Sequence, residues 1–174
     1  IISTDDDFQS RLDEVTRRAA EYKLENDTYS QSSTILVGQH TTLLGGNADL
    51  RTQGSTDYDP FPVVEFTNDV DGFETDPNVS YRVHHPMWED ITISGTGASN
   101  TSAAVRLSEN ADAEDVGFAE FDNCFFEQYN TAVNGEGSAD GARFRNCHVQ
   151  LCTDGFVNLS VEAWIDQCTF FDMS

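Results

Sequence analysis

A six-residue pattern of apolar and polar side chains occurs four times in the chain. The four hexads are Trp88-Glu89-Asp90-Ile91-Thr92-Ile93, Phe121-Asp122-Asn123-Cys124-Phe125-Phe126, Phe144-Arg145-Asn146-Cys147-His148-Val149 and Ile165-Asp166-Gln167-Cys168-Thr169-Phe170. Positions one, four and six are apolar, whereas positions two and five are mostly polar. The hexads begin at residues 88, 121, 144 and 165, which gives spacings of 33, 23 and 21 residues. Repeats of this length are typical of solenoids, in which successive turns of the chain stack on one another.

The third position of the hexad is expected to form a bend. Strict alternation would bury positions one, three and five, so the change of phase after position three requires the backbone to turn there. Asp90, Asn123 and Asn146 occupy this position, and Asn and Asp tolerate the left-handed conformation that a tight bend needs. In adjacent turns Asn123 and Asn146 are expected to form a hydrogen-bonded ladder, from which Gln167 departs.

The fourth position is cysteine in the last three hexads, at Cys124, Cys147 and Cys168. In adjacent turns these side chains would stack about 4.8 Å apart, facing inward as small hydrophobes. A disulfide is possible by distance but awkward between parallel side chains. We expect no metal site and no cofactor, because the chain has no CxxC pair and stacked positions do not converge tetrahedrally.

The remaining segments predict one domain with a helical start. Residues 1–20 are expected to form a helix, because Ser3 or Thr4 can cap it and an apolar face recurs at helical spacing; that face comprises Phe8, Leu12, Val15 and Ala19. Residues 21–174 carry short strand-like runs, and the polar stretch near 67–87 is predicted to be a long loop. A second apolar site, Ala132–Asn134 or Phe156–Asn158, follows each middle hexad, so each repeat is expected to contain more than one strand. We interpret the chain as a segment of a longer polypeptide.

The hexads resemble the repeats of the pectate-lyase-like right-handed parallel β-helix family, whose stacked coils carry an asparagine ladder at a bend. The N-terminal part is similar to the entry of phage tailspikes, on the residues Tyr22, Leu24, Tyr29, Ile35 and Thr42-Leu43-Leu44-Gly45. At residues 25–29 this chain lacks the Pro and Gly of the tailspike pattern. The resemblance implies an all-β, right-handed parallel β-helix with an N-terminal capping α-helix, and a homotrimer as in spikes. No catalytic motif of the family is present, so the resemblance implies no activity.

Charge changes the picture of where such a protein works. The chain has 31 acidic and 9 basic residues, a net charge of −22, and Lys23 is its only lysine. Such a charge self-repels in dilute buffer, but at molar salt the Debye length falls to roughly 3 Å and the repulsion is screened. This composition predicts a halophilic protein, from a haloarchaeon or its virus. It disfavours nucleic-acid binding, and no apolar run approaches the length that would insert into a membrane.

The outward hexad positions supply the candidate chemistry. Asp122 and Asp166 would lie two turns apart, roughly 9–10 Å, near the upper end for the carboxylate pair of an inverting glycosidase. His148 could assist as an acid or base. Arg145 between the two aspartates favours instead a solvated ion-pair row, so we assign no catalytic residue. Phe125, Arg145 and His148 are candidate binding residues, although Phe125 could alternatively lie in the core.

Together these features predict a virion surface or spike protein of a haloarchaeal virus. Its expected role is host attachment through a glycan or surface-layer glycoprotein, in partnership with further copies of itself or other virion proteins. Its expected location is the virion surface or another extracellular, hypersaline site. A polysaccharide lyase or glycoside hydrolase of the same fold, and a secreted haloarchaeal cell-surface adhesin, are the alternatives, because fold alone does not choose among them.

Overall fold

The computed structural model describes residues 1–4, 6–13, 20–45, 61–97, 101–109, 116–160 and 162–173. Within these residues the chain is all-β, as predicted: eighteen short strands form three parallel sheets, and one short helix precedes them. No helix in this part of the chain is both long and apolar enough to cross a membrane.

Each of the three sheets contains six strands. The first sheet runs in the order β1 (Ala20–Lys23), β4 (Thr41–Leu44), β7 (Met87–Glu89), β11 (Glu120–Asp122), β14 (Arg143–Arg145) and β17 (Trp164–Asp166). The second runs in the order β2 (Thr28–Gln31), β5 (Val63–Phe66), β8 (Thr92–Ser94), β12 (Phe125–Glu127), β15 (His148–Gln150) and β18 (Thr169–Phe171). The third runs in the order β3 (Ile35–Val37), β6 (Phe73–Thr75), β9 (Ala103–Arg106), β13 (Thr131–Asp140) and β10 (Val116–Gly117), with β16 (Asp154–Leu159) also paired with β13.

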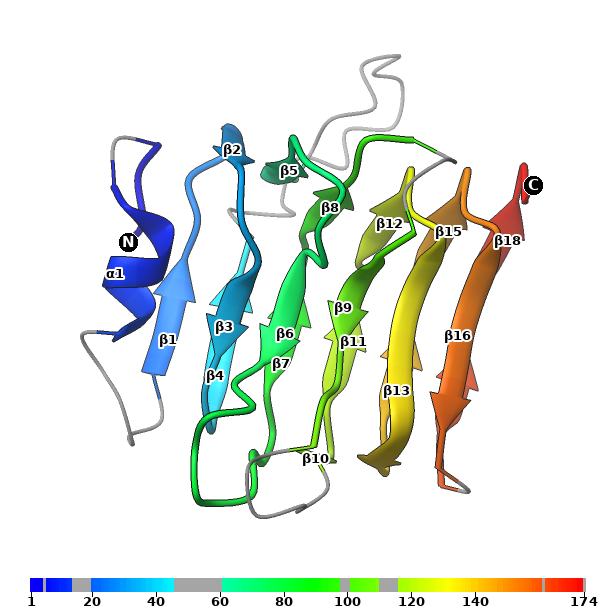
Figure 1. The fold of residues 1–174 in the computed structure, drawn as a ribbon. Helices are drawn as coiled ribbons and strands as arrows, with labels where there is room; N and C mark the ends of the chain where they lie inside the picture. The colour runs from blue at the N-terminus through cyan, green and yellow to red at the C-terminus, as the bar shows by residue number, and fades with distance from the viewer. Residues whose placement is uncertain are drawn as a thin grey trace.

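The chain visits the three sheets in rotation. One strand from each sheet follows in turn, from β1, β2 and β3 to β16, β17 and β18, with β10 as an extra short strand in the third sheet. Figure 1 shows the result: equivalent strands of successive passages lie side by side, from α1 at one end to β18 at the other. Every strand pair is parallel, so a residue on one strand has its equivalent directly alongside on the next.

The hexads align in the register that the sequence predicts. Phe121 pairs with Trp88 on one side and with Phe144 on the other, and Phe144 pairs with Ile165. The Phe121 ring stacks on Trp88 at 4.8 Å and on Phe144 at 4.9 Å between ring centroids, with interplanar angles of 6° and 1°. Trp88, Phe121 and Phe144 are buried. Trp88, Phe121 and Phe144 therefore form an interior column of stacked rings, whereas Ile165, the first position of the last hexad, is 53% exposed.

The predicted bend is present between the first and second sheets. Residues at the third hexad position all have positive φ: 56° at Asp90, 55° at Asn123, 53° at Asn146 and 53° at Gln167. Gly45 occupies the same corner in the turn before Asp90. A Cβ on Gly45 would lie 1.8 Å from the Asp90 carbonyl oxygen, so only glycine fits beneath the next turn. In the first three hexads this bend directs positions two and five outward while positions one, four and six fill the core; in the last hexad Ile165 and Phe170 are exposed.

Part of the predicted loop near 67–87 is a strand. β6 lies inside this stretch and pairs with β3 and β9, and its Phe73 and Thr75 side chains are fully buried. Three residues offer too little alternation to reveal a strand against polar surroundings, because only Phe73 is apolar. The residues that follow, 76–86, contain turns, bends and one parallel bridge from His84 to Gly117 before β7.

The helix at the start of the chain is shorter than residues 1–20. α1 spans Phe8–Asp13, Ala20 already belongs to β1, and Ile2 is fully buried in a parallel bridge with Leu24. Asp7, rather than Ser3 or Thr4, caps the helix by accepting a 3.1 Å hydrogen bond from the Ser10 backbone N–H. Val15 and Ala19 of the predicted apolar face lie outside the described residues.

α1 covers the end of the sheets at which the first strands, β1, β2 and β3, lie. Phe8 is buried and meets Tyr29 and Phe73 edge to face at 6.0 and 6.1 Å. The Gln9 side chain accepts a hydrogen bond from the Leu36 backbone N–H at 2.6 Å and donates one to its carbonyl oxygen at 3.2 Å. Gln9 thus satisfies backbone groups of β3 that would otherwise lack a neighbouring strand.

Candidate functional site

The predicted site residues lie on the outward faces of two sheets that meet at the bend. On the first sheet Asp122 pairs with Arg145, and Arg145 pairs with Asp166. On the second sheet Phe125 pairs with His148. The structure therefore gathers these five residues in two short rows on either side of the corner formed by Asn123 and Asn146, as the outward hexad positions require.

The first-sheet row is a set of paired charges. Arg145 donates a hydrogen bond to Asp122 in an ion pair, and this bond raises the pKa of the arginine. In the neighbouring column Arg143 lies 3.7 Å from Glu120. The Arg145 side chain is 61% exposed, so its ion pair adds little stability. The Arg145–Asp122 ion pair is one half of the Asp122-Arg145-Asp166 row that the sequence favours over a catalytic carboxylate pair.

Glu89, next to Asp122 on the first sheet, has a raised pKa. Partial burial is the largest cause, followed by repulsion from the carboxylates of Asp90 and Asp122. Sequence reasoning did not single out this residue, because the shift depends on neighbours brought in from the bend and from the next turn.

The second-sheet row presents an aromatic surface. The Phe125 ring stacks on His148 with centroids 4.5 Å apart and 19° between planes. Phe126 is fully buried, so of the two alternatives for Phe125 the structure has the outward one. The ring centroids of Phe61 and Phe125 lie 6.0 Å apart. Beside them lies a groove of about 580 Å³, whose polar lining includes Glu65, Glu127, Gln128 and Gln150.

The corner between the rows is held by the ladder residues. The Asn123 side chain donates a 2.6 Å hydrogen bond to Asp90, and Asn146 donates one of 3.4 Å to Asp122. Both acceptors are aspartate oxygens of the preceding turn. Asp90 is the third hexad residue of its turn, and Asp122 is the residue just before the bend at Asn123. The amide groups fix the backbone from which both rows project.

The cysteines form the predicted inward column. Cys124 and Cys147 are fully buried, Cys168 is partly buried, and all are free thiols. The hydrogen bond with Cys124 raises the pKa of Cys147, and the one with Cys147 raises the pKa of Cys168. Raised pKa values disfavour the thiolate, which is the nucleophilic and metal-binding form. This chemistry fits a structural role.

Sequence reasoning missed a second aromatic residue on the outward face. Trp164 precedes the last hexad and pairs with Arg143, whose guanidinium carbon lies 5.1 Å from the Trp164 ring centroid. Trp164 borders a pocket of about 250 Å³ over β11, β14 and β17. A signal existed, since Trp164 comes one residue before Ile165, which the hexad pattern expects to point inward, and alternation then places Trp164 outward. That Arg143, 21 residues earlier, lies beside Trp164 is evident only once the strand register is known.

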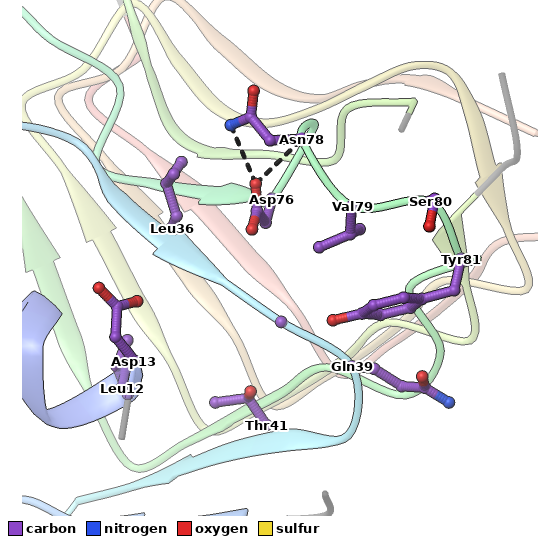
Figure 2. A pocket seen from close by; sticks show the side chains of 11 residues that line it. Leu12, Asp13, Leu36, Gln39, Thr41, Asp76, Asn78, Val79, Ser80 and Tyr81 are labelled. Atoms are coloured by element: carbon purple, nitrogen blue, oxygen red, sulfur yellow. Dashed lines mark hydrogen bonds between the residues drawn. The ribbon is translucent and has the colours of Figure 1, made fainter. Parts of the chain in front are cut away.

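A further pocket lies far from these rows, near α1. It measures about 310 Å³ and is lined by residues of α1, the turn between β3 and β4, and the segment after β6. Figure 2 shows that one of its two acidic side chains, Asp76, already accepts hydrogen bonds from Asn78, from the backbone N–H at 2.9 Å and from the side chain at 3.1 Å. None of the predicted site residues lines this pocket, so the two outward rows remain the candidate site.

Comparison with known proteins adds no relative: no protein-family model, no curated protein and no solved structure matches the chain. The structure thus defines a class, an all-β protein with three parallel sheets visited in rotation. The likeness to pectate-lyase-like and tailspike β-helices rests on sequence patterns in the hexads and in the N-terminal part. What the two outward rows offer chemically is a rigid surface with flat aromatic faces, paired charges and hydrogen-bonding side chains.

Proposed function

We propose that this chain is an attachment module that binds a host-surface glycan or surface-layer glycoprotein in a hypersaline environment. In this proposal the three sheets close into a right-handed parallel β-helix, several copies assemble into a homotrimeric spike, and the spike belongs to the virion of a halophilic virus. The rotation of the chain through the sheets supports the β-helix, and the composition supports the environment.

The observation that carries the proposal is the outward aromatic row beside a polar groove. Phe125 and His148 stack face to face on the outside of the second sheet, where burial in the core does not explain them. Flat aromatic faces bind the apolar faces of sugar rings, while carboxylate and amide groups such as Glu127 and Gln150 bind hydroxyls. A sugar surface is the ligand class that matches both features.

The rigid backbone favours binding of an extended, repetitive ligand. Most of the groove residues project from paired strands, and Phe61 and Gln128 lie just outside them, so little backbone freedom is lost on binding. The chain's charge of −22 disfavours anionic partners such as nucleic acid. Binding of a neutral or weakly charged glycan involves neither this charge repulsion nor a large loss of conformational freedom.

The test is binding of the full chain to haloarchaeal surface-layer glycoprotein in molar KCl, before and after chemical deglycosylation. We expect binding to disappear on deglycosylation, and Phe125→Ala to weaken it about tenfold, which corresponds to ~1.4 kcal/mol of lost stacking. Phe118→Asn is the matched control, because Phe118 is also partly exposed but stacks on His85 outside the groove. Unchanged binding after deglycosylation, or in Phe125→Ala, would contradict the proposal.

Glycan cleavage is a second candidate function, favoured by the raised pKa of Glu89. A carboxyl that holds its proton at higher pH, beside Asp122, resembles the acid and base partners of glycosidases. New reducing ends or unsaturated products from host exopolysaccharide, lost in Glu89→Gln and Asp122→Asn, would establish it. The cell-surface adhesin predicts the same binding chemistry, and a gene located among capsid and tail genes would favour the spike over it.

A further inference from the structure

The pocket beside Trp164 is lined by both aromatic and charged residues. Trp164 is 51% exposed, and its ring faces the Arg143 guanidinium. The charged lining comes from outward residues of β11 and β14 and from Asp166, and Phe121 and Phe144 of the same two strands also contribute to the lining. At about 250 Å³ the pocket has room for one small ring rather than for a chain segment.

Both arginines of this pocket already lie beside a carboxylate. Arg145 is paired with Asp122, and Arg143 lies 3.7 Å from Glu120. With Asp166 the pocket holds three carboxylates and two guanidinium groups. An anionic ligand would have to displace a carboxylate from an arginine, against the net charge of −22 on the chain. A ligand with hydroxyl groups can donate to the carboxylates and accept from the arginines without breaking either pair.

Salt reinforces this choice. At molar ionic strength, attraction between an exposed arginine and a ligand anion is screened over roughly 3 Å. Contact between the Trp164 ring and the C–H face of a sugar does not depend on net charge, so molar salt does not weaken it. A neutral ligand therefore retains its affinity under the conditions that the composition of this protein favours.

We infer that the Trp164 pocket is a subsite for one neutral pyranose residue of the surface glycan. The sugar ring stacks on Trp164, and its hydroxyls hydrogen-bond to Asp166 and to the Asp122–Arg145 pair. The inference rests on the proposed attachment function and deepens it, because it names the sugar class and a second contact on the first sheet, around the corner from Phe125.

The test is acrylamide quenching of tryptophan fluorescence on the full chain in molar KCl. The chain has two tryptophans. Trp88 is fully buried, so the quencher reports on Trp164. We expect neutral oligosaccharides ending in glucose, galactose or mannose to protect Trp164, and oligogalacturonates to leave it accessible. Protection by oligogalacturonates alone would overturn the inference.

Variants separate this subsite from the attachment function itself. By calorimetry, Trp164→Ala is expected to lose about tenfold or more in affinity for the protecting neutral sugar, with Trp164→Phe intermediate because it keeps a smaller stacking face. Met173→Ala, another exposed apolar residue of the last turn, is expected to bind as wild type. A sugar whose binding falls in Phe125→Ala but not in Trp164→Ala would overturn the subsite and leave the proposed function standing. Absence of binding to any glycan would overturn both.

Discussion

Truncation of Phe121 probes the interior column on which the outward rows depend. The Phe121 side chain is 1% exposed and lies between the stacked rings of Trp88 and Phe144. Burial of a phenylalanine contributes about 1.5–3 kcal/mol, and each aromatic contact adds about 0.5–1.5 kcal/mol. Phe121→Ala should therefore destabilise the protein by about 3–5 kcal/mol, which is also the range for large-to-small changes that leave a cavity.

Urea unfolding in molar KCl measures this effect, because urea leaves the ionic strength unchanged. With a slope of roughly 2 kcal/mol per molar urea, the midpoint should fall by about 2 M without a change in slope. Phe125→Ala is the control, since its ring lies outside on the second sheet; it should cost about 1 kcal/mol. A larger loss for Phe125→Ala than for Phe121→Ala would refute the assignment of inward and outward positions.

Three further predictions follow from the bend, from one carboxyl and from the net charge. Asn123→Ala should lose about 2–3 kcal/mol in urea unfolding, because alanine resists φ 55° and lacks the bond to Asp90, whereas Asn123→Gly should recover the backbone part; equal losses would contradict this account. Because the pKa of Glu89 is raised in the folded state, its contribution to stability is present below its ordinary value of 4.5 and lost as pH rises through the raised value. Glu89→Gln should therefore be more stable than wild type at neutral pH and flatten the pH profile just above 4.5, and an unchanged profile would refute the shift. Lowering KCl from molar to about 0.1 M lengthens the Debye length to about 10 Å, so the melting temperature should fall because the charge of −22 is no longer screened; an unchanged melting temperature would argue against a halophilic protein.

The sequence predicts the hexads well because their constraint is local. A strand of period two interrupted by a bend leaves two signatures in six residues: a shift in the apolar phase, and a residue that tolerates positive φ. Asn123 and Asn146 carry the second signature, and both lie at 53–55°. Gln167 has the same conformation without the preferred residue type, because the neighbouring turn imposes it.

Other elements could not be predicted because distant neighbours determine them. The strand β6 is three residues long and exists through pairing with β3 and β9 on either side. Residues 1–20 are expected to form one helical segment, but Ile2 is buried in a bridge with Leu24, 22 residues away, which the local pattern does not reveal. The pocket at Trp164 needs Arg143 and Glu120 from two earlier turns, so its composition depends on a register that no single segment encodes.

The measurement that tests the central claim most directly is a set of proton–proton NOEs between aromatic rings in the folded chain. The account predicts ring-to-ring NOEs from Phe121 to Trp88 and from Phe121 to Phe144, residues far apart in sequence whose centroids lie 4.8 and 4.9 Å apart. Phe125 should instead show NOEs to His148. If Phe121 gave no NOE to Trp88 or Phe144, or if Phe125 took its place in that column, the stacking of the turns and both outward rows would be wrong.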